Sequence, residues 1–137
     1  FNELQEAMQK TAANTRMKLV LALSYSSKWE IIQAVKKIAS SVVAGSISID
    51  DINDSTITAH LCTSGMPDPE LMIRTSGEQR ISNFLLYQLA YAELYFSPVL
   101  WPDFRKEHLV EAIKDYQSRE RRFGKTSAQV QSNENKM

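Results

Sequence analysis

The sequence predicts an α/β fold in which helices wrap a mostly parallel sheet. Two apolar runs, Met17–Tyr25 and Leu71–Ile73, have the hydrophobicity of strands that are covered on both faces. Amphipathic segments with helical spacing of their apolar residues lie before, between and after these runs. Such alternation of helices and strands along a chain is typical of parallel sheets. A chain of 137 residues is long enough for one domain with its own core.

The composition excludes several classes of function. Sixteen basic side chains balance sixteen acidic ones, so no general electrostatic field favours nucleic acid as a partner. The single cysteine, Cys62, cannot form an internal disulfide, which indicates a reducing, cytoplasmic environment. No apolar run approaches the length of a membrane-spanning helix. Contact with a lipid is therefore expected inside a protein cavity or peripherally, at the inner face of a membrane.

The first half of the chain predicts helix, strand and helix. An amphipathic helix opens the chain and ends near Asn14, and the Met17–Tyr25 strand follows. Ser27 and Glu30 have the spacing of a capping box for the next helix, which Gly45 ends. The apolar face predicted for that helix comprises Ile31, Ile32, Val35, Ile38, Ala39 and Val42.

The second half begins with a short helix over Asp54–Thr63, for which Asp54 is the expected cap. A proline-containing loop, Gly65–Pro69, separates this helix from the Leu71–Ile73 strand. The Asp50–Asp54 stretch reads DDxxD, a metal-diphosphate motif of all-helical prenyltransferases. Because it lies in a linker here, we interpret it as a coincidence.

The last third predicts a helix that turns into a strand. Ser82 and Asn83 are expected to cap the apolar segment Phe84–Phe96, which becomes a strand near Ala92. Asp103 is the expected cap of a final helix. The apolar residues at core spacing in that helix are Leu109, Ala112, Ile113 and Tyr116.

Polar side chains follow the Leu71–Ile73 strand, at a sheet edge where open α/β folds bind ligands. Arg74, Arg80 and Ser82 can converge on one multiply charged group, because guanidinium groups match phosphate oxygens in pairs. The expected helix start at Ser82 would add backbone N–H donors. These residues are equally consistent with a structural network in which Glu78 holds an arginine.

Glu93 is the only charged residue between Phe84 and Phe96. A carboxylate in such an apolar segment needs a cation nearby, because an unpaired buried charge is costly. An arginine is one candidate for this cation. Mg²⁺ is the other, since it prefers one or two carboxylates together with phosphate oxygens and water.

Three stretches of the sequence resemble the cis-prenyltransferase family, especially bacterial undecaprenyl diphosphate synthases. The longest is LMIRTSGEQRISNFLLYQLAYAELYFSPVLWPDF, residues 71–104, and the others are SRERRFG at 118–124 and LSYSSKWE at 23–30. The resemblance covers residues 1–125, which we interpret as part of one prenyltransferase domain. The polar tail, residues 126–137, is predicted to be disordered.

The resemblance implies a condensation of isopentenyl diphosphate with an allylic prenyl diphosphate by a homodimer, giving a lipid product that contacts the membrane. It implies that Arg74, Arg80 and Ser82 bind the diphosphate of isopentenyl diphosphate. It also implies that Glu93 is a ligand of Mg²⁺, in a site that two subunits share. Arg122 and Gly124 match an Arg-x-Gly element that would complete the neighbouring subunit's site.

The sequence departs from the family pattern in two places. Ser26-Ser27-Lys28 stands where relatives often carry Gly-Gly-Arg, and the Asp-Gly-Asn loop with the family's essential aspartate is missing. We therefore expect a C-terminal fragment with residues upstream of Phe1, no catalytic residue of its own and no activity alone. The alternative is a non-catalytic accessory subunit of a heteromeric enzyme, and a weaker one is a nucleotide-binding module.

Overall fold

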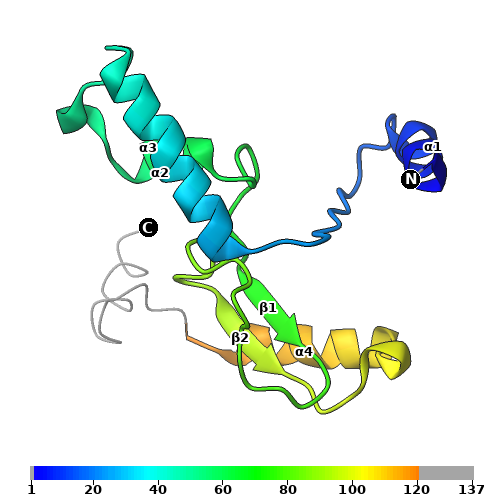
Figure 1. Ribbon diagram of the computed structural model, residues 1–137. Coiled ribbons are helices and arrows are strands. Elements are labelled where there is room, and N and C mark those ends of the chain that lie inside the picture. The colour runs from blue at the N-terminus through cyan, green and yellow to red at the C-terminus, as the bar shows by residue number, and fades with distance from the viewer. Residues whose placement is uncertain (1, 121–137) are drawn as a thin grey trace, which may run out of the picture.

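The computed structural model describes residues 2–120. Figure 1 shows α4 beside the strand pair, and α1 apart from the other elements at the end of a long extended segment. Short 3₁₀ turns lie at Ile49–Asp51 and Trp101–Asp103. The helices and strands are α1 (Asn2–Thr11), α2 (Ser27–Val43), α3 (Asp54–His60), β1 (Leu71–Arg74), β2 (Glu93–Phe96) and α4 (Lys106–Ser118).

The strands β1 and β2 are parallel, with Leu71 opposite Glu93 and Arg74 opposite Phe96. Parallel strands require a crossover between them, and residues 75–92 form it. α4 packs against β2, and α2 packs against α3. The predicted α/β class with parallel strands is confirmed, and both strands begin within two residues of the predicted positions.

The strand predicted at Met17–Tyr25 is wrong, because these residues have no strand structure. A parallel strand is stable only beside hydrogen-bonded neighbours, and the sheet of the described residues contains β1 and β2 alone. More than half of the surface of each large apolar side chain in this run is exposed: Met17, Leu19, Val20, Leu21 and Leu23.

α2 forms as predicted, but its cap differs. The N-cap is Ser26, whose hydroxyl accepts a hydrogen bond from the backbone N–H of Trp29. Ser27 and Glu30 are buried and bond to other parts of the chain, so the predicted capping box is wrong. The buried face is also narrower than predicted: Ile38 is buried, whereas Ile32 and Val35 are exposed among the described residues.

The caps of the two later helices lie one or two residues from their predicted positions. Asn53, not Asp54, caps α3, through a reciprocal pair of hydrogen bonds with Thr56. Arg105 is the N-cap of α4, whereas Asp103 lies in the preceding 3₁₀ turn. In each case the helix itself was predicted correctly.

The helix predicted after Ser82 is absent from the described chain, and a series of turns connects Ser82 to Glu93. Ser82, Asn83 and Leu85 have φ angles of 48°, 63° and 48°, in the left-handed region. A right-handed helix cannot include such residues. Ser82 therefore offers no helix N-terminus to a ligand, and that part of the predicted anion site is wrong.

Candidate functional site

A pocket of about 280 Å³ lies beside the carboxyl end of β1. Its apolar wall comes from Met72, Ile81 and Phe84. Its polar wall is the end of the strand and the turn that follows, Arg74, Thr75 and Ser76. The edge of the sheet at which the sequence predicted a ligand therefore contains a cavity with one charged and one hydrocarbon side.

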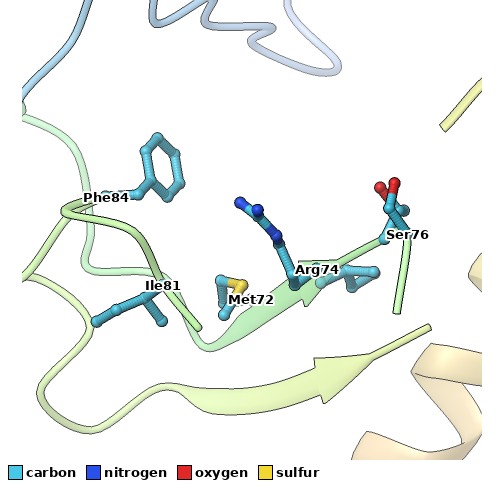
Figure 2. Close-up of a pocket in the computed structure, with 7 residues that line it drawn as sticks. Met72, Arg74, Ser76, Ile81 and Phe84 are labelled. Atoms are coloured by element: carbon cyan, nitrogen blue, oxygen red, sulfur yellow. The ribbon is translucent and has the colours of Figure 1, made fainter. Parts of the chain in front are cut away.

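Arg74 is the cationic group of this pocket. Figure 2 shows its guanidinium group extending from β1 into the space between Phe84 and Ser76. Its Nε atom is buried and has no hydrogen-bond partner among the described residues. Buried donors are normally paired, so this N–H is a candidate for bonding a ligand.

The turn after β1 is fixed by backbone hydrogen bonds to the chain that leaves β2. The N–H of Ser76 donates to the carbonyl of Val99 over 2.8 Å, and the N–H of Gly77 donates to the carbonyl of Ser97 over 2.9 Å. Ser76 and Gly77 both have positive φ, at 70° and 69°. The turn that carries the polar wall of the pocket is thus hydrogen-bonded to the segment that follows β2.

The other two predicted anion-binding residues lie next to the pocket but do not line it. Arg80 is largely exposed and forms an ion pair with Glu78. Ser82 is exposed. Ile81, which stands between them, is part of the pocket wall. The structure thus places Arg80 and Ser82 beside the pocket, and the Arg–Glu network that the sequence left open is present.

Glu93 lies at the first position of β2 and pairs with an arginine. Its Oε2 atom accepts a hydrogen bond from Nη1 of Arg119 over 2.9 Å. The same guanidinium group bonds the carbonyl of Leu94 and the carboxylate of Asp115. The bond to Glu93 raises the pKa of Arg119. Sequence reasoning did not single out Arg119 as this partner.

Glu93 and Arg74 lie at opposite ends of the strand pair. Glu93 is opposite Leu71, and Arg74 is three residues further along β1. At about 3.3 Å per residue, the two Cα positions are about 10 Å apart along the strands. Within one chain, the structure does not bring Glu93 together with the pocket at Arg74.

A buried carboxylate that sequence reasoning assigned to a helix cap connects to the pocket through Tyr25, whose ring contacts Phe84. Glu30 is 1% exposed. Its Oε1 atom accepts hydrogen bonds from the phenol of Tyr25 and from Nε2 of Gln88, and its Oε2 atom accepts one from the N–H of Cys62. Burial alone would raise the pKa of Glu30, but these hydrogen bonds outweigh it and the pKa is lowered. The signal in the sequence was Gln88, a polar residue inside an apolar run.

The remaining sequence expectations divide by position. Arg122 and Gly124 lie outside the described residues, as does the 126–137 tail. Between residues 2 and 120, no group of three or more His, Cys, Asp or Glu side chains is arranged to hold a metal, so the DDxxD stretch forms no such cluster. In the same range, no helix has the length and apolarity needed to cross a bilayer.

The comparisons with known proteins decide the family. A prenyltransferase family model, described as undecaprenyl diphosphate synthase, matches residues 1–124. The chain belongs to the undecaprenyl diphosphate synthase family of cis-prenyltransferases. An isoprenyl transferase of Porphyromonas gingivalis is 53% identical over 97% of this chain and 52% of its own length. A ditrans,polycis-undecaprenyl-diphosphate synthase of Vibrio vulnificus is 51% identical over 95% of this chain and 52% of its own length.

Two solved structures of the cis-prenyltransferase family superpose on this fold. Lavandulyl diphosphate synthase of Lavandula x intermedia, in complex with dimethylallyl diphosphate, has a TM-score of 0.83 at 40% identity over 91% of this chain and 56% of its own. A probable undecaprenyl diphosphate synthase of Campylobacter jejuni has a TM-score of 0.71 at 34% identity over 90% of this chain and 55% of its own. The chain spans about half the length of the curated relatives it matches.

Proposed function

We propose that this chain carries the isopentenyl diphosphate site of an enzyme that condenses isopentenyl diphosphate with an allylic diphosphate to make undecaprenyl diphosphate. The unpartnered guanidinium N–H of Arg74 in the pocket is the observation that carries the proposal. Relatives named for undecaprenyl diphosphate and isoprenyl transfer support the substrate class.

The two walls of the pocket suit the two halves of isopentenyl diphosphate. Arg74, Thr75 and Ser76 offer N–H and O–H donors to the diphosphate. Met72, Ile81 and Phe84 offer apolar contacts to the five-carbon group. A nucleotide would need a larger site with groups that recognise a base, so the pocket favours a small prenyl ligand.

Arg80 and Ser82 extend the diphosphate contacts in this proposal. Arg80 is exposed, and its ion pair with Glu78 lies in solvent, where such a pair contributes little to stability. Its guanidinium group can therefore exchange the carboxylate for a phosphate oxygen. The role of Arg74, Arg80 and Ser82 is to fix the diphosphate and orient the isopentenyl group, which lowers the barrier by positioning.

We also propose that Glu93 is a ligand of Mg²⁺ in a homodimer. The donor set fits this metal, because Mg²⁺ takes few carboxylates and completes its shell with phosphate oxygens and water. The Arg119 bond uses Oε2 of Glu93, so Oε1 is the oxygen that a metal can take. The separation of Glu93 from the Arg74 pocket within one chain supports a site shared between subunits. When bound, Mg²⁺ stabilises the charge of a departing diphosphate.

By its resemblance to the family, the condensation would use an aspartate in an Asp-Gly-Asn loop, and these 137 residues contain no such motif. We therefore propose that the chain alone binds substrate but does not elongate prenyl chains. The alternative is an accessory subunit of a heteromeric enzyme. An accessory subunit has little need for a pocket with its own unpaired guanidinium N–H, so binding of isopentenyl diphosphate separates the two.

Isothermal titration of the chain with isopentenyl diphosphate tests the proposal, with ATP as the competing ligand class. Arg74→Met keeps the length of the side chain but removes the guanidinium group, and it should weaken binding about 10- to 100-fold, the effect of losing one or two charged hydrogen bonds. Arg16→Met is the matched control, since Arg16 is exposed and does not line this pocket. Equal affinities of the two variants, or preference for ATP, would contradict the proposal.

A further inference from the structure

We propose that the first turn of α2, including Glu30, forms a positioning device that fixes residues 81–86, the segment that carries Ile81 and Phe84 of the apolar wall of the Arg74 pocket. Glu30 touches no ligand in this proposal and acts through Tyr25, Gln88 and the backbone. The inference rests on the proposed function for its ligand, isopentenyl diphosphate. It adds to that function a set of residues that do not line the pocket but control its affinity for this ligand.

Residues 81–86 need stabilising contacts from other parts of the chain because their backbone is strained. Ser82, Asn83 and Leu85 all have left-handed φ angles. This conformation costs about 1–2 kcal/mol each at Ser82 and Leu85, whereas Asn tolerates it better. Such conformations persist only when the surroundings impose them. Ile81 and Phe84, which alternate with these residues, are the ones that line the pocket.

The N-cap and first turn of α2 supply part of these stabilising contacts. Ser27, 0% exposed, donates its N–H to the carbonyl of Asn83 over 3.1 Å and accepts at Oγ from the N–H of Leu86 over 2.9 Å. The side chain of Asn83 accepts from the N–H of Lys28 and donates to the hydroxyl of Ser26, both over 2.9 Å. Four hydrogen bonds thus connect Ser26, Ser27 and Lys28 to the strained segment.

Glu30, three residues after Ser27 in the same turn of α2, supplies the remaining contacts. Its Oε1 atom binds the phenol of Tyr25, and the Tyr25 ring meets the ring of Phe84 edge to face, with centroids 5.7 Å apart. The same oxygen binds Nε2 of Gln88, which also donates to the hydroxyl of Thr63 over 2.9 Å. Tyr25 therefore connects Glu30 directly to a residue of the pocket wall, and Gln88 fixes the far end of the segment.

The free-energy cost of burying the Glu30 carboxylate explains how it can fix its neighbours. A full charge at 1% exposure is costly unless hydrogen bonds stabilise it. Its three partners come from the residue before the helix cap, the segment after α3 and the crossover between the strands. No one of these elements can shift without leaving the charge undersatisfied, so the network holds the three in one arrangement.

The experiment compares Glu30→Gln and Tyr25→Phe with Ile38→Ala, which lies on the same helix, is 6% exposed and has no part in the network. Two quantities are measured under conditions where each variant is folded: hydrogen exchange of residues 81–86 and the affinity for isopentenyl diphosphate. Glu30→Gln should speed exchange in this segment and weaken binding about 10-fold, since it removes at least one bond to the charge. Tyr25→Phe should do the same by about threefold. Ile38→Ala should change neither by more than about twofold, although it lowers stability.

Equal effects of Glu30→Gln and Ile38→Ala would overturn the proposal, because loss of general stability would then explain both. Unchanged exchange at 81–86 in Tyr25→Phe would overturn it as well, and this variant decides the case if Glu30→Gln does not fold. If the parent chain binds no isopentenyl diphosphate, the proposed function fails. Exchange at 81–86 then still tests the positioning role by itself.

Discussion

The pair formed by Arg119 and Glu93 is the contact that joins the end of α4 to the start of β2. Nη1 of Arg119 lies 2.9 Å from Oε2 of Glu93 and 3.0 Å from the carbonyl oxygen of Leu94, and Nη2 lies 2.5 Å from Asp115. The side chains of Arg119 and Glu93 are 32% and 26% exposed. The pair is thus shielded from water on most sides, unlike an ion pair on an open surface.

The magnitude follows from this partial burial. Exposed pairs contribute about 0.2–1 kcal/mol, and breaking a fully buried pair costs about 3–5 kcal/mol. We expect a coupling energy between Arg119 and Glu93 of about 1–2 kcal/mol, between these limits. Arg119→Met also loses the bonds to Leu94 and Asp115, so this single change should destabilise the chain by about 2–4 kcal/mol.

A double-mutant cycle measures this coupling. Urea unfolding is followed by circular dichroism for the parent chain, Arg119→Met, Glu93→Gln and the double variant. The control cycle uses Lys10 and Glu6 on α1, an i,i+4 pair whose side chains are 72% and 62% exposed. That pair should couple by no more than about 0.5 kcal/mol. A coupling at Arg119 and Glu93 no larger than in the control would refute the reasoning from burial.

Three further predictions follow from single groups. Folding lowers the pKa of Glu30. The contribution of its carboxylate to the free energy of unfolding is therefore complete above about pH 4.3, the pKa in the unfolded chain, and is lost as the pH falls through the pKa in the folded chain. The difference in stability between the parent and Glu30→Gln should narrow in acid. Burial and the bond to Glu30 raise the pKa of Tyr25 to about 12. The contribution of the protonated phenol to the free energy of unfolding is therefore complete below about pH 10 and is lost as the pH rises through about 12. In urea unfolding, Tyr25→Phe should abolish this loss of stability at alkaline pH. Gly45 has a φ of 72°, and a Cβ added there would meet no neighbouring atom of the described chain within 4 Å, so Gly45→Ala should lower the free energy of unfolding by about 1 kcal/mol through the backbone alone. Gly45→Asn should cost less in the same assay.

The sequence was informative where local rules decide the structure. α2, α3 and α4 form where the helical spacing of apolar residues predicted them, although the cap residue of each differs, and Glu93 begins a strand next to β1. Arg74 ends β1 and lines a pocket, as its place after an apolar run indicated. The positions of the helices and of the strand ends depend on neighbours within a few residues, which a sequence displays.

The wrong predictions concern segments whose structure depends on contacts with residues that are distant in the sequence. The Met17–Tyr25 run has the composition of a strand, but it lies beside no partner strand in the described chain. The turns after Ser82 replace a helix because Ser27 and Asn83, which are 56 residues apart in the sequence, bond each other. Glu30 matches a capping box locally, yet its partners lie up to 58 residues away. Rules based on residue spacing do not predict such long-range contacts.

The most direct test of the account observes the Arg74 side chain itself during titration with isopentenyl diphosphate. Nuclear magnetic resonance of the arginine Nε–H groups resolves the buried donor that has no partner in the described structure. The Arg74 signal should shift and saturate as isopentenyl diphosphate is added, while the signal of exposed Arg16 stays unchanged. An Arg74 signal that does not move while the ligand binds elsewhere on the chain would show that Arg74 does not bind the diphosphate.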